Sequence, residues 1–386
     1  MANLENFHFT FQQKKQIDEF LKDIKMWDEK IPQELEDSEF LSGKNGKDIF
    51  NFLKDYHKKL QEKIHGYKNF TNIYQKRDFK ISSFEADRIA LGNCPVASKN
   101  TRCCNLLTLD AVNSCGFDCL YCAVQSFYKG NNVEYDKNFA QNLEKLELDK
   151  NKIYHIGTGQ SSDSLLWNNK FGELSALMKF AKKYKNLILE LKSKSKNISY
   201  LLENEIPRNV IATFSLNTPE IIQNEEHLTA RFDERISAAK KLAEKGILIG
   251  FHFHPLVWYD NFFIDYGEIF ERILNEFDPK NVALISFGTL TFTKPVIKKI
   301  RSREIKSKIL QMPFEMINNK FSYPLKIKKE MFHFAYKSFT PWHDEVFFYL
   351  CMEDKSLWRE CFGYEYASND EFERAMKSAY MAKIWS

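Results

Sequence analysis

A cysteine-rich segment near the first third of the chain reads Asn113-Ser-Cys-Gly-Phe-Asp-Cys-Leu-Tyr-Cys-Ala-Val-Gln-Ser-Phe-Tyr128. Its cysteines, Cys115, Cys119 and Cys122, are separated by three and then two residues. They follow an apolar, alternating run, Leu106 to Val112, which predicts a strand. A short loop with this spacing can turn three thiolates towards one point.

Three thiolates are one ligand short of a closed zinc site, which normally uses four. They suit a four-iron cluster in which three irons bind cysteine and the fourth stays open for chemistry. The alternative is a zinc knot completed by Cys94, Cys103 or Cys104. Cys103 and Cys104 are adjacent, and adjacent side chains on a strand diverge, so we expect no second metal there.

Length and composition indicate a globular chain. Its 386 residues allow two or three domains, or one large α/β barrel with extensions. Apolar residues make up 44%, and 56 basic against 52 acidic side chains leave a formal charge of only +4. We expect a soluble, cytoplasmic chain without a membrane span, because no long apolar run occurs and eight cysteines are too few for a disulfide scaffold.

Residues 1–90 predict a charged helical extension. Apolar residues recur at helical spacing in two stripes, and a turn at Ser42–Gly46 separates them. The first stripe comprises Ile17, Phe20, Leu21, Ile24 and Trp27, and the second comprises Ile49, Phe52, Leu53, Tyr56 and Leu60. We expect a helical hairpin; a substrate- or partner-binding extension is the alternative.

Six apolar runs alternate with helical patterns between residues 106 and 288. The predicted strands are 106–113, 152–157, 187–194, 209–217, 247–254 and 281–288, and the helices include 138–148, 171–184, 231–245 and 262–276. This alternation favours parallel strands with right-handed crossovers. Six units are too few to close an eight-stranded barrel, so the sequence predicts an α/β fold with a partial (β/α)6 barrel. A doubly wound sheet is the alternative.

The sequence therefore divides into a helical extension (1–90), a partial barrel (91–290) and a C-terminal α+β extension (291–386). The last part contains an apolar strand, Val346 to Cys351, and a final helix at 369–382. A basic run at 294–308 precedes them and comprises Lys294, Lys298, Lys299, Arg301, Arg303, Lys306 and Lys308. It either contacts a nucleic-acid backbone or forms the solvated face of a helix.

Polar side chains gather at the carboxyl ends of three consecutive predicted strands. They are Glu190, Lys192 and Lys194, then Thr213, Ser215 and Asn217, then His252 and His254. Residues two apart share a strand face, and barrel enzymes build their active sites at this end. We therefore expect a polar cavity, in which the histidines line a pocket, shuttle protons, or pack as hydrogen-bonded residues.

Several of these residues are candidates for binding a ligand. Gly157-Thr158-Gly159-Gln160 closes the second strand, where glycines allow backbone to approach a ligand closely. Lys194 supplies a positive charge for a carboxylate, or it is a solvated lysine. Ser215 and Asn217 bond a ligand, or they cap the helix that begins near Pro219.

Together these segments resemble the spore photoproduct lyase family of radical S-adenosylmethionine enzymes. The resemblance covers roughly residues 90–365, in matches that keep the same order along the chain. The matching segments are Cys115–Cys122, Gly157–Ser164, Leu189–Lys194, Phe214–Asn217, Thr229–Ala239, Gly250–Pro255, Ser286–Leu290 and Tyr349–Glu353.

The resemblance implies a DNA-repair lyase with a 4Fe-4S cluster on the three cysteines of the loop. The cluster would cleave S-adenosylmethionine to a 5′-deoxyadenosyl radical, which takes hydrogen from a DNA photolesion. An electron donor of the flavodoxin or ferredoxin type is implied as a partner. The cofactor would be held by the backbone near Tyr121 and by Gly157, Thr158, Gly159, Gln160, Ser162, Asp163, Lys194, Ser215 and Asn217.

The chain departs from the family pattern at two positions. Gln160 stands where the family has a hydrogen-donating cysteine, and Ala123 stands where it has a tyrosine that forms a radical relay with the one matched by Tyr121. An amide has no weak S–H bond, so Tyr121 or Cys351 returns the hydrogen, or the reaction differs. Cys351 lies in an apolar predicted strand, where we expect an inert, buried thiol.

Two alternative functions follow from these departures. The first is radical modification of a small molecule or protein, with the same cofactors. The second is a zinc-stabilised nucleic-acid-binding protein.

Overall fold

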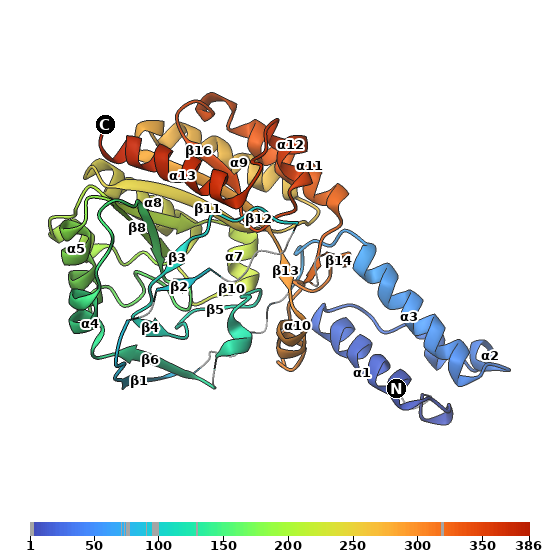
Figure 1. The fold of residues 1–386 in the computed structure, drawn as a ribbon. Coiled ribbons are helices and arrows are strands. Elements are labelled where there is room, and N and C mark those ends of the chain that lie inside the picture. The colour runs from blue at the N-terminus through green and yellow to red at the C-terminus, as the bar shows by residue number, and fades with distance from the viewer. Residues whose placement is uncertain are drawn as a thin grey trace. The chain divides into compact units, whose positions relative to one another are not determined.

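The computed structural model describes residues 4–70, 72, 74, 78–89, 91–94, 100–128, 130–317 and 320–386. The chain forms two compact units (Figure 1). One comprises Met1–Lys76, Trp258–Asn261 and Thr291–Pro324, and the other comprises Arg77–Val257, Phe262–Leu290 and Leu325–Ser386. Among the helices that the structure describes, none combines the length and apolarity needed to cross a membrane.

The larger unit is built on an eight-stranded sheet of order β16-β12-β11-β9-β8-β7-β3-β2. Its strands are β2 (Gly92–Asn93), β3 (Leu107–Thr108), β7 (Tyr154–Thr158), β8 (Leu187–Ser193), β9 (Val210–Ser215), β11 (Leu248–Leu256), β12 (Val282–Thr289) and β16 (Phe347–Leu350). Neighbours from β3 to β16 are parallel, and β2 is antiparallel to β3. The order follows the chain from β3 to β16 without reversal. This confirms the partial barrel over the doubly wound sheet, whose order reverses.

The structure differs from the predicted strands at two places. The predicted strand 106–113 breaks into β3 and β4 (Val112–Asn113), and β4 pairs in a separate sheet with β6 (Asn132–Asp136). At the other end β16 joins the main sheet in parallel with β12. This strand is added because α11 (Leu325–Ser338) supplies a further crossover, which the count of six units had not included.

Helices cover the outer face of the sheet (Figure 1). They are α4 (Phe139–Lys145), α5 (Glu173–Lys183), α6 (Ser199–Glu203), α7 (Pro219–Glu225), α8 (Phe232–Glu244), α9 (Phe262–Glu276), α11 and α12 (Ser356–Phe362). Helix α13 (Asn369–Ile384) packs on the inner face instead, where Tyr380 contacts His155 and Phe372 contacts Tyr349. Strand β8 shows why the layers form: Leu187, Leu189 and Leu191 are fully buried on one face, and Glu190 is fully buried on the other. The apolar face packs under helices, while the barrel interior is polar.

Short elements complete this unit. A small sheet has the order β1-β6-β4, with β1 (Lys80–Phe84) parallel to β6. A two-stranded ribbon pairs β5 (Asp118–Cys119) with β10 (Glu226–His227). The 3-10 turns are Gln125–Phe127, Pro279–Asn281 and Thr340–Trp342.

The smaller unit contains the predicted helical hairpin. Helices α1 (Phe11–Met26) and α3 (Gly46–Glu62) begin at capping boxes, and α2 (Ser38–Leu41) lies between them in the chain. Their shared apolar core comprises Phe9, Ile17, Leu35, Ile49 and Leu53. The unit also holds the 3-10 turns Leu4–Asn6 and Gln33–Glu36, helix α10 (Lys294–Arg301) and the antiparallel sheet β13-β15-β14, formed by Thr291–Phe292, Lys320–Ser322 and Glu315–Ile317.

A buried carboxylate joins α1 to α10 within this unit. Asp23, which is fully buried, accepts hydrogen bonds from Arg301 Nε and Nη2 at 2.7 and 2.6 Å, and it lies 2.8 Å from His57 Nε2. Lys306 and Lys308 of the basic run also pair with acidic residues near the end of α1, Asp28 and Glu29. Part of the positive charge of the run is therefore balanced inside the unit.

We predict that Asp23→Ala destabilises the smaller unit by about 3–5 kcal/mol, the usual cost of removing one partner of a buried ion pair. Hydrogen exchange of α1 and α3 in increasing urea measures this. Asp18→Ala is the control, because Asp18 is 61% exposed in its pair with Lys22 and should cost below about 1 kcal/mol. Equal protection in the two variants would show that the buried pair adds nothing.

Candidate active site

The cysteine loop is held against the ribbon strand β10. Cys119 lies opposite Glu226 in the β5–β10 pair, and the Leu120 N–H donates to Glu225 O at 2.9 Å. Inside the loop, the Phe117 N–H donates to Cys115 Sγ at 3.4 Å and the Cys122 N–H donates to Cys119 O at 3.2 Å. Backbone bonds to a second segment therefore fix a loop that is too short to fold by itself.

The three thiols influence one another. Burial raises the pKa of Cys115, and the charges of Asp163, Cys119 and Cys122 raise it further. Within the described residues, no three His, Cys, Asp or Glu side chains are placed to hold a single metal ion. A four-iron cluster binds its cysteines through separate irons, so its ligands need not converge on one point. Three neighbouring soft thiols fit such a cluster.

A buried network of charges lies beside this loop. The Tyr121 hydroxyl bonds Glu226 Oε1, and Lys194 Nζ donates to Tyr121 Oη at 2.8 Å and to Glu226 Oε1 at 3.0 Å. Arg235 Nη2 donates to Glu226 Oε2 at 2.6 Å, and both of these side chains are fully buried. Lys194 is only 15% exposed, so the interpretation as a solvated lysine is wrong.

Two cations and one carboxylate leave this network with one net positive charge. Burial raises the pKa of Glu226, but Arg235 and Lys194 outweigh burial and bring it down to about 2, so Glu226 is ionised at neutral pH. Sequence reasoning named neither Glu226 nor Arg235 as a site residue. Their signal was indirect: Arg235 lies in the matching segment Thr229–Ala239, in the first half of helix α8.

The Gly157–Gln160 turn is held by a residue that the sequence analysis did not single out. Asp110 follows β3 and accepts hydrogen bonds from the Gln160 and Ser161 N–H groups at 3.0 and 3.1 Å. Gly159 has φ +76°, and a Cβ there would lie 2.9 Å from Lys192 O. Close packing of the turn on β8 therefore requires this glycine.

The other predicted cofactor-binding residues fall into two groups. Asp163 already accepts bonds from Leu165 N, Leu166 N, Ser193 Oγ and Lys194 N, at 2.7–3.0 Å. Asn217 is fully buried, donates to Pro255 O at 3.0 Å and accepts from the Tyr266 hydroxyl at 2.6 Å. The cap of α7 is Thr218 rather than Ser215 or Asn217.

Ser162 is different, because its hydroxyl oxygen is buried and bonds no group among the described residues. Ser215 is partly exposed at the end of β9, and its carbonyl oxygen accepts from Arg235 Nη1 at 2.8 Å. A buried polar atom without a partner costs free energy. Ser162 therefore fits a position that a polar ligand occupies.

The polar strand ends meet inside the barrel, as predicted. Glu190 lies 2.8 Å from His155 Nε2 and 2.6 Å from His252 Nε2, and it accepts from the Thr213 hydroxyl at 3.0 Å. Ser286 Oγ extends this hydrogen-bond network, because it lies 2.5 Å from His252 Nδ1 and 3.0 Å from His254 Nε2. The histidines are therefore packed and hydrogen-bonded.

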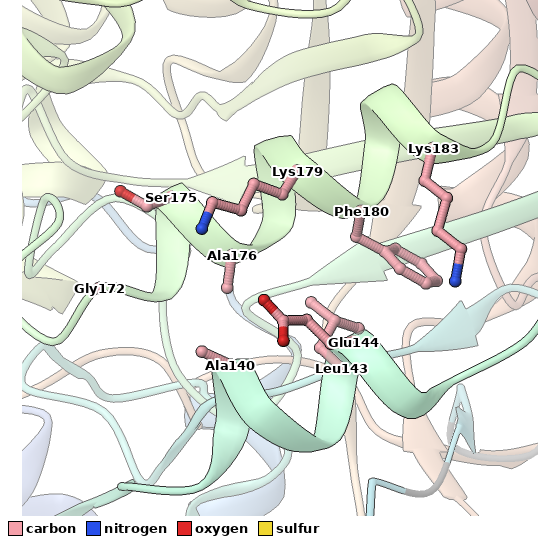
Figure 2. Close-up of a pocket in the computed structure, with 9 residues that line it drawn as sticks. All are labelled: Ala140, Leu143, Glu144, Gly172, Ser175, Ala176, Lys179, Phe180 and Lys183. Atoms are coloured by element: carbon pink, nitrogen blue, oxygen red, sulfur yellow. The ribbon is translucent and has the colours of Figure 1, made fainter.

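A surface groove lies away from the residues of the candidate active site. A groove of about 400 Å³ opens between α4 and α5 on the outer helical layer (Figure 2). Glu144 extends from α4, and Lys179 and Lys183 extend from α5 (Figure 2). No residue of the cysteine loop or of the buried charge network lines the groove, so it is not part of the candidate active site.

We predict that Glu190→Gln destabilises the larger unit by about 1–3 kcal/mol. The glutamine NH2 group would face one of the three donors that the carboxylate now accepts from. Urea unfolding followed by circular dichroism measures this. The same substitution at Glu205, which is 89% exposed, should stay within about 0.5 kcal/mol of the parent. A stable Glu190→Gln variant would mean that the interior network is hydrated and adaptable.

Comparisons with known proteins agree with this geometry. The sequence model of the spore photoproduct lyase family matches residues 106–331, which is more than half of the chain. The spore photoproduct lyase of Clostridium acetobutylicum is 26% identical over 199 residues, and that of a Geobacillus species is 25% identical over 202 residues. Each match covers 50% of this chain and 59% of the relative. The chain thus spans about three fifths of the length of these relatives.

Solved structures share the fold. A spore photoproduct lyase complexed with dinucleoside spore photoproduct has a TM-score of 0.59 and 18% identity, covering 81% of this chain and 96% of its own. A mutant with bound AdoMet and dinucleoside spore photoproduct also has a TM-score of 0.59, with 16% identity, covering 82% of this chain and 96% of its own. With the family match spanning the cysteine loop and the barrel strands β7 to β12, the chain belongs to the spore photoproduct lyase family.

Proposed function

We propose that this chain is a radical S-adenosylmethionine lyase that repairs a photolesion of DNA. The observation that carries the proposal is the position of the cysteine loop, whose Tyr121 bonds directly to Lys194 and Glu226 in a buried network of net positive charge. The substrate class is supported by the relatives, two of whose structures contain dinucleoside spore photoproduct.

Cys115, Cys119 and Cys122 would hold a 4Fe-4S cluster. When bound, the cluster and S-adenosylmethionine supply a 5′-deoxyadenosyl radical that takes a hydrogen atom from the substrate. The net positive charge around Lys194 would attract the cofactor carboxylate, and the unpartnered hydroxyl of Ser162 would donate to a polar group of the cofactor. Ser215, at the end of β9, is connected to this network through Arg235, which donates to its carbonyl oxygen.

Asp163 and Asn217 would act as positioning residues, because their side chains are already bonded within the protein. Asp163 fixes the Lys194 backbone and the turn after Ser162. The Gly157–Gln160 turn, which Asp110 holds, would bring backbone close to the amino group of the cofactor. Tyr121, buried beside Lys194, would be the side chain of this group nearest to the radical chemistry.

The partners of the proposed reaction are DNA and a low-potential electron donor of the flavodoxin or ferredoxin type. Within the basic run, Lys294 and Lys298 are exposed on α10, whereas Arg301 is bonded to Asp23. A DNA contact through this run would therefore involve few charges and depend only weakly on salt.

The test is formation of 5′-deoxyadenosine by the anaerobically reconstituted, reduced protein, with and without dinucleoside spore photoproduct. We expect iron and sulfide in the protein, and deoxyadenosine formation that the lesion increases. Cys119→Ala should lose the iron and sulfide and form no deoxyadenosine. Cys361→Ala, which removes a buried thiol of α12, should keep the iron and sulfide and form deoxyadenosine as the parent does. Deoxyadenosine formation that is the same with and without the lesion would favour a small-molecule or protein substrate. Zinc in place of iron would overturn the enzyme proposal.

We predict that Lys194→Met weakens S-adenosylmethionine binding roughly 10- to 100-fold without loss of iron, since a hydrogen bond to a charged group contributes about 1.5–3 kcal/mol. Equilibrium dialysis of the reconstituted variants measures the affinity. Lys196→Met is the control, because Lys196 is 58% exposed and pairs with Glu234 at the surface. Equal affinities in the two variants would remove Lys194 from the cofactor site.

A further inference from the structure

Four cysteines outside the cysteine loop form a group, and three of them, Cys94, Cys104 and Cys351, interact with Lys192. We call Cys94, Cys103, Cys104 and Cys351 the thiol group. Burial and then the charge of Cys94 raise the pKa of Cys351, and Cys104 is hydrogen-bonded to Cys103. Lys192 lowers the pKa of both Cys104 and Cys351, against the effect of burial. The thiols therefore form one neighbourhood, although the sequence places them in three separate segments.

The fold holds these segments together through backbone contacts. Cys94 follows β2, and its N–H donates to Leu106 O at 3.0 Å. The Cys351 N–H donates to Phe287 O at 2.8 Å, just beyond the end of β16. A bridge between Thr101 and Asp354 joins the segment of Cys103 to that of Cys351. Cys351 directly follows the last residue of β16 and is partly exposed, while burial of its thiol raises the pKa.

Cys94 contacts the Gly157–Gln160 turn. Gln160 Nε2 lies 3.7 Å from Cys94 Sγ, which is hydrogen-bond distance for sulfur. The Gln160 backbone is fixed by Asp110, and β3 lies between β2, which Cys94 follows, and β7, which precedes the turn of Gln160. Cys94 and Gln160 are both partly exposed, so a ligand can reach them.

The thiol group and the cluster loop face the same interior. Lys192 lies in β8 and Lys194 directly follows its last residue, Ser193; residues two apart along a strand share a face and are about 7 Å from each other. Lys194 reaches Tyr121 of the cluster loop, while Lys192 reaches the thiols. A substrate bound between the cysteine loop and Lys192 would therefore lie close to Cys94.

The proposed reaction needs a hydrogen-atom donor, because the lesion gives up one hydrogen and the repaired product regains one. A thiol is the suitable group, since its S–H bond is weaker than the C–H bond that forms. Gln160 has no such bond, and the Tyr121 hydroxyl is engaged by Glu226 and Lys194. Cys361 is buried in α12, bonded to Lys329 O.

We propose that Cys94 is the catalytic hydrogen-atom donor; this rests on the proposed lyase function. The product-side carbon radical forms a C–H bond as the S–H bond of Cys94 breaks, which leaves a thiyl radical. One electron from the low-potential reductant and one proton from solvent restore the thiol. Thiol hydrogens exchange with water, so product formed in D2O carries one deuterium at the carbon that was repaired.

The test compares Cys94→Ser with Cys361→Ser on dinucleoside spore photoproduct. We expect Cys94→Ser to form deoxyadenosine but to lower the ratio of repaired product to deoxyadenosine at least about tenfold. Cys361→Ser should keep the ratio of the parent. Adding Gln160→Cys to Cys94→Ser should restore the ratio and the deuterium label, which a merely structural role of Cys94 would not allow.

A second readout needs no turnover. Iodoacetamide should alkylate Cys94 in the iron-free protein, and the dinucleoside should slow this alkylation several-fold without protecting Cys103. A parent that forms no repaired product overturns the proposed function, and the role of Cys94 with it. If Cys94→Ser keeps the ratio of repaired product to deoxyadenosine, the role of Cys94 is overturned and the proposed function stands. The same holds if Cys351→Ser lowers this ratio and Cys94→Ser does not.

Discussion

The buried carboxylate of Glu226 is the interaction on which the candidate site depends. Tyr121 from the cluster loop, Lys194 from the end of β8 and Arg235 from α8 all bond to it. A buried charge without partners would be costly, so Glu226 stabilises the association of these three segments. The same arrangement leaves one net positive charge, which under the proposed function would attract the cofactor carboxylate. The same buried network thus stabilises the fold and supplies the charge that the proposed chemistry uses.

A second constraint is the polar interior of the barrel. Glu190 is ionised between His155, His252 and Thr213, because Lys192 and the histidines lower its pKa well below its usual value despite burial. The apolar face of each strand packs against helices, so stability comes from the outside of the sheet. The interior can therefore hold a network of buried, hydrogen-bonded polar residues.

Prediction from the sequence succeeded where periodicity is strong and local. The strands that become β7, β8, β9, β11 and β12 were placed within one or two residues, since apolar runs bounded by polar residues mark them. The break at Asp110 was missed, because it depends on hydrogen bonds to a turn 50 residues later in the chain. Strand β16 was assigned to an extension for a similar reason: its partner β12 is distant in sequence, and the segment Thr291–Pro324 of the smaller unit lies between them along the chain.

The sequence by itself determined the spacing of the three loop cysteines, the alternation of strands and helices, and the family resemblance, because each is a pattern along the chain. Only the tertiary structure decided that Glu226 and Arg235 support Lys194, that Asp163 and Asn217 are already bonded within the protein, and that Cys94 lies against Gln160. These contacts join residues from separate strands and loops. Their distances follow from sheet order and crossover geometry, which local sequence patterns do not encode.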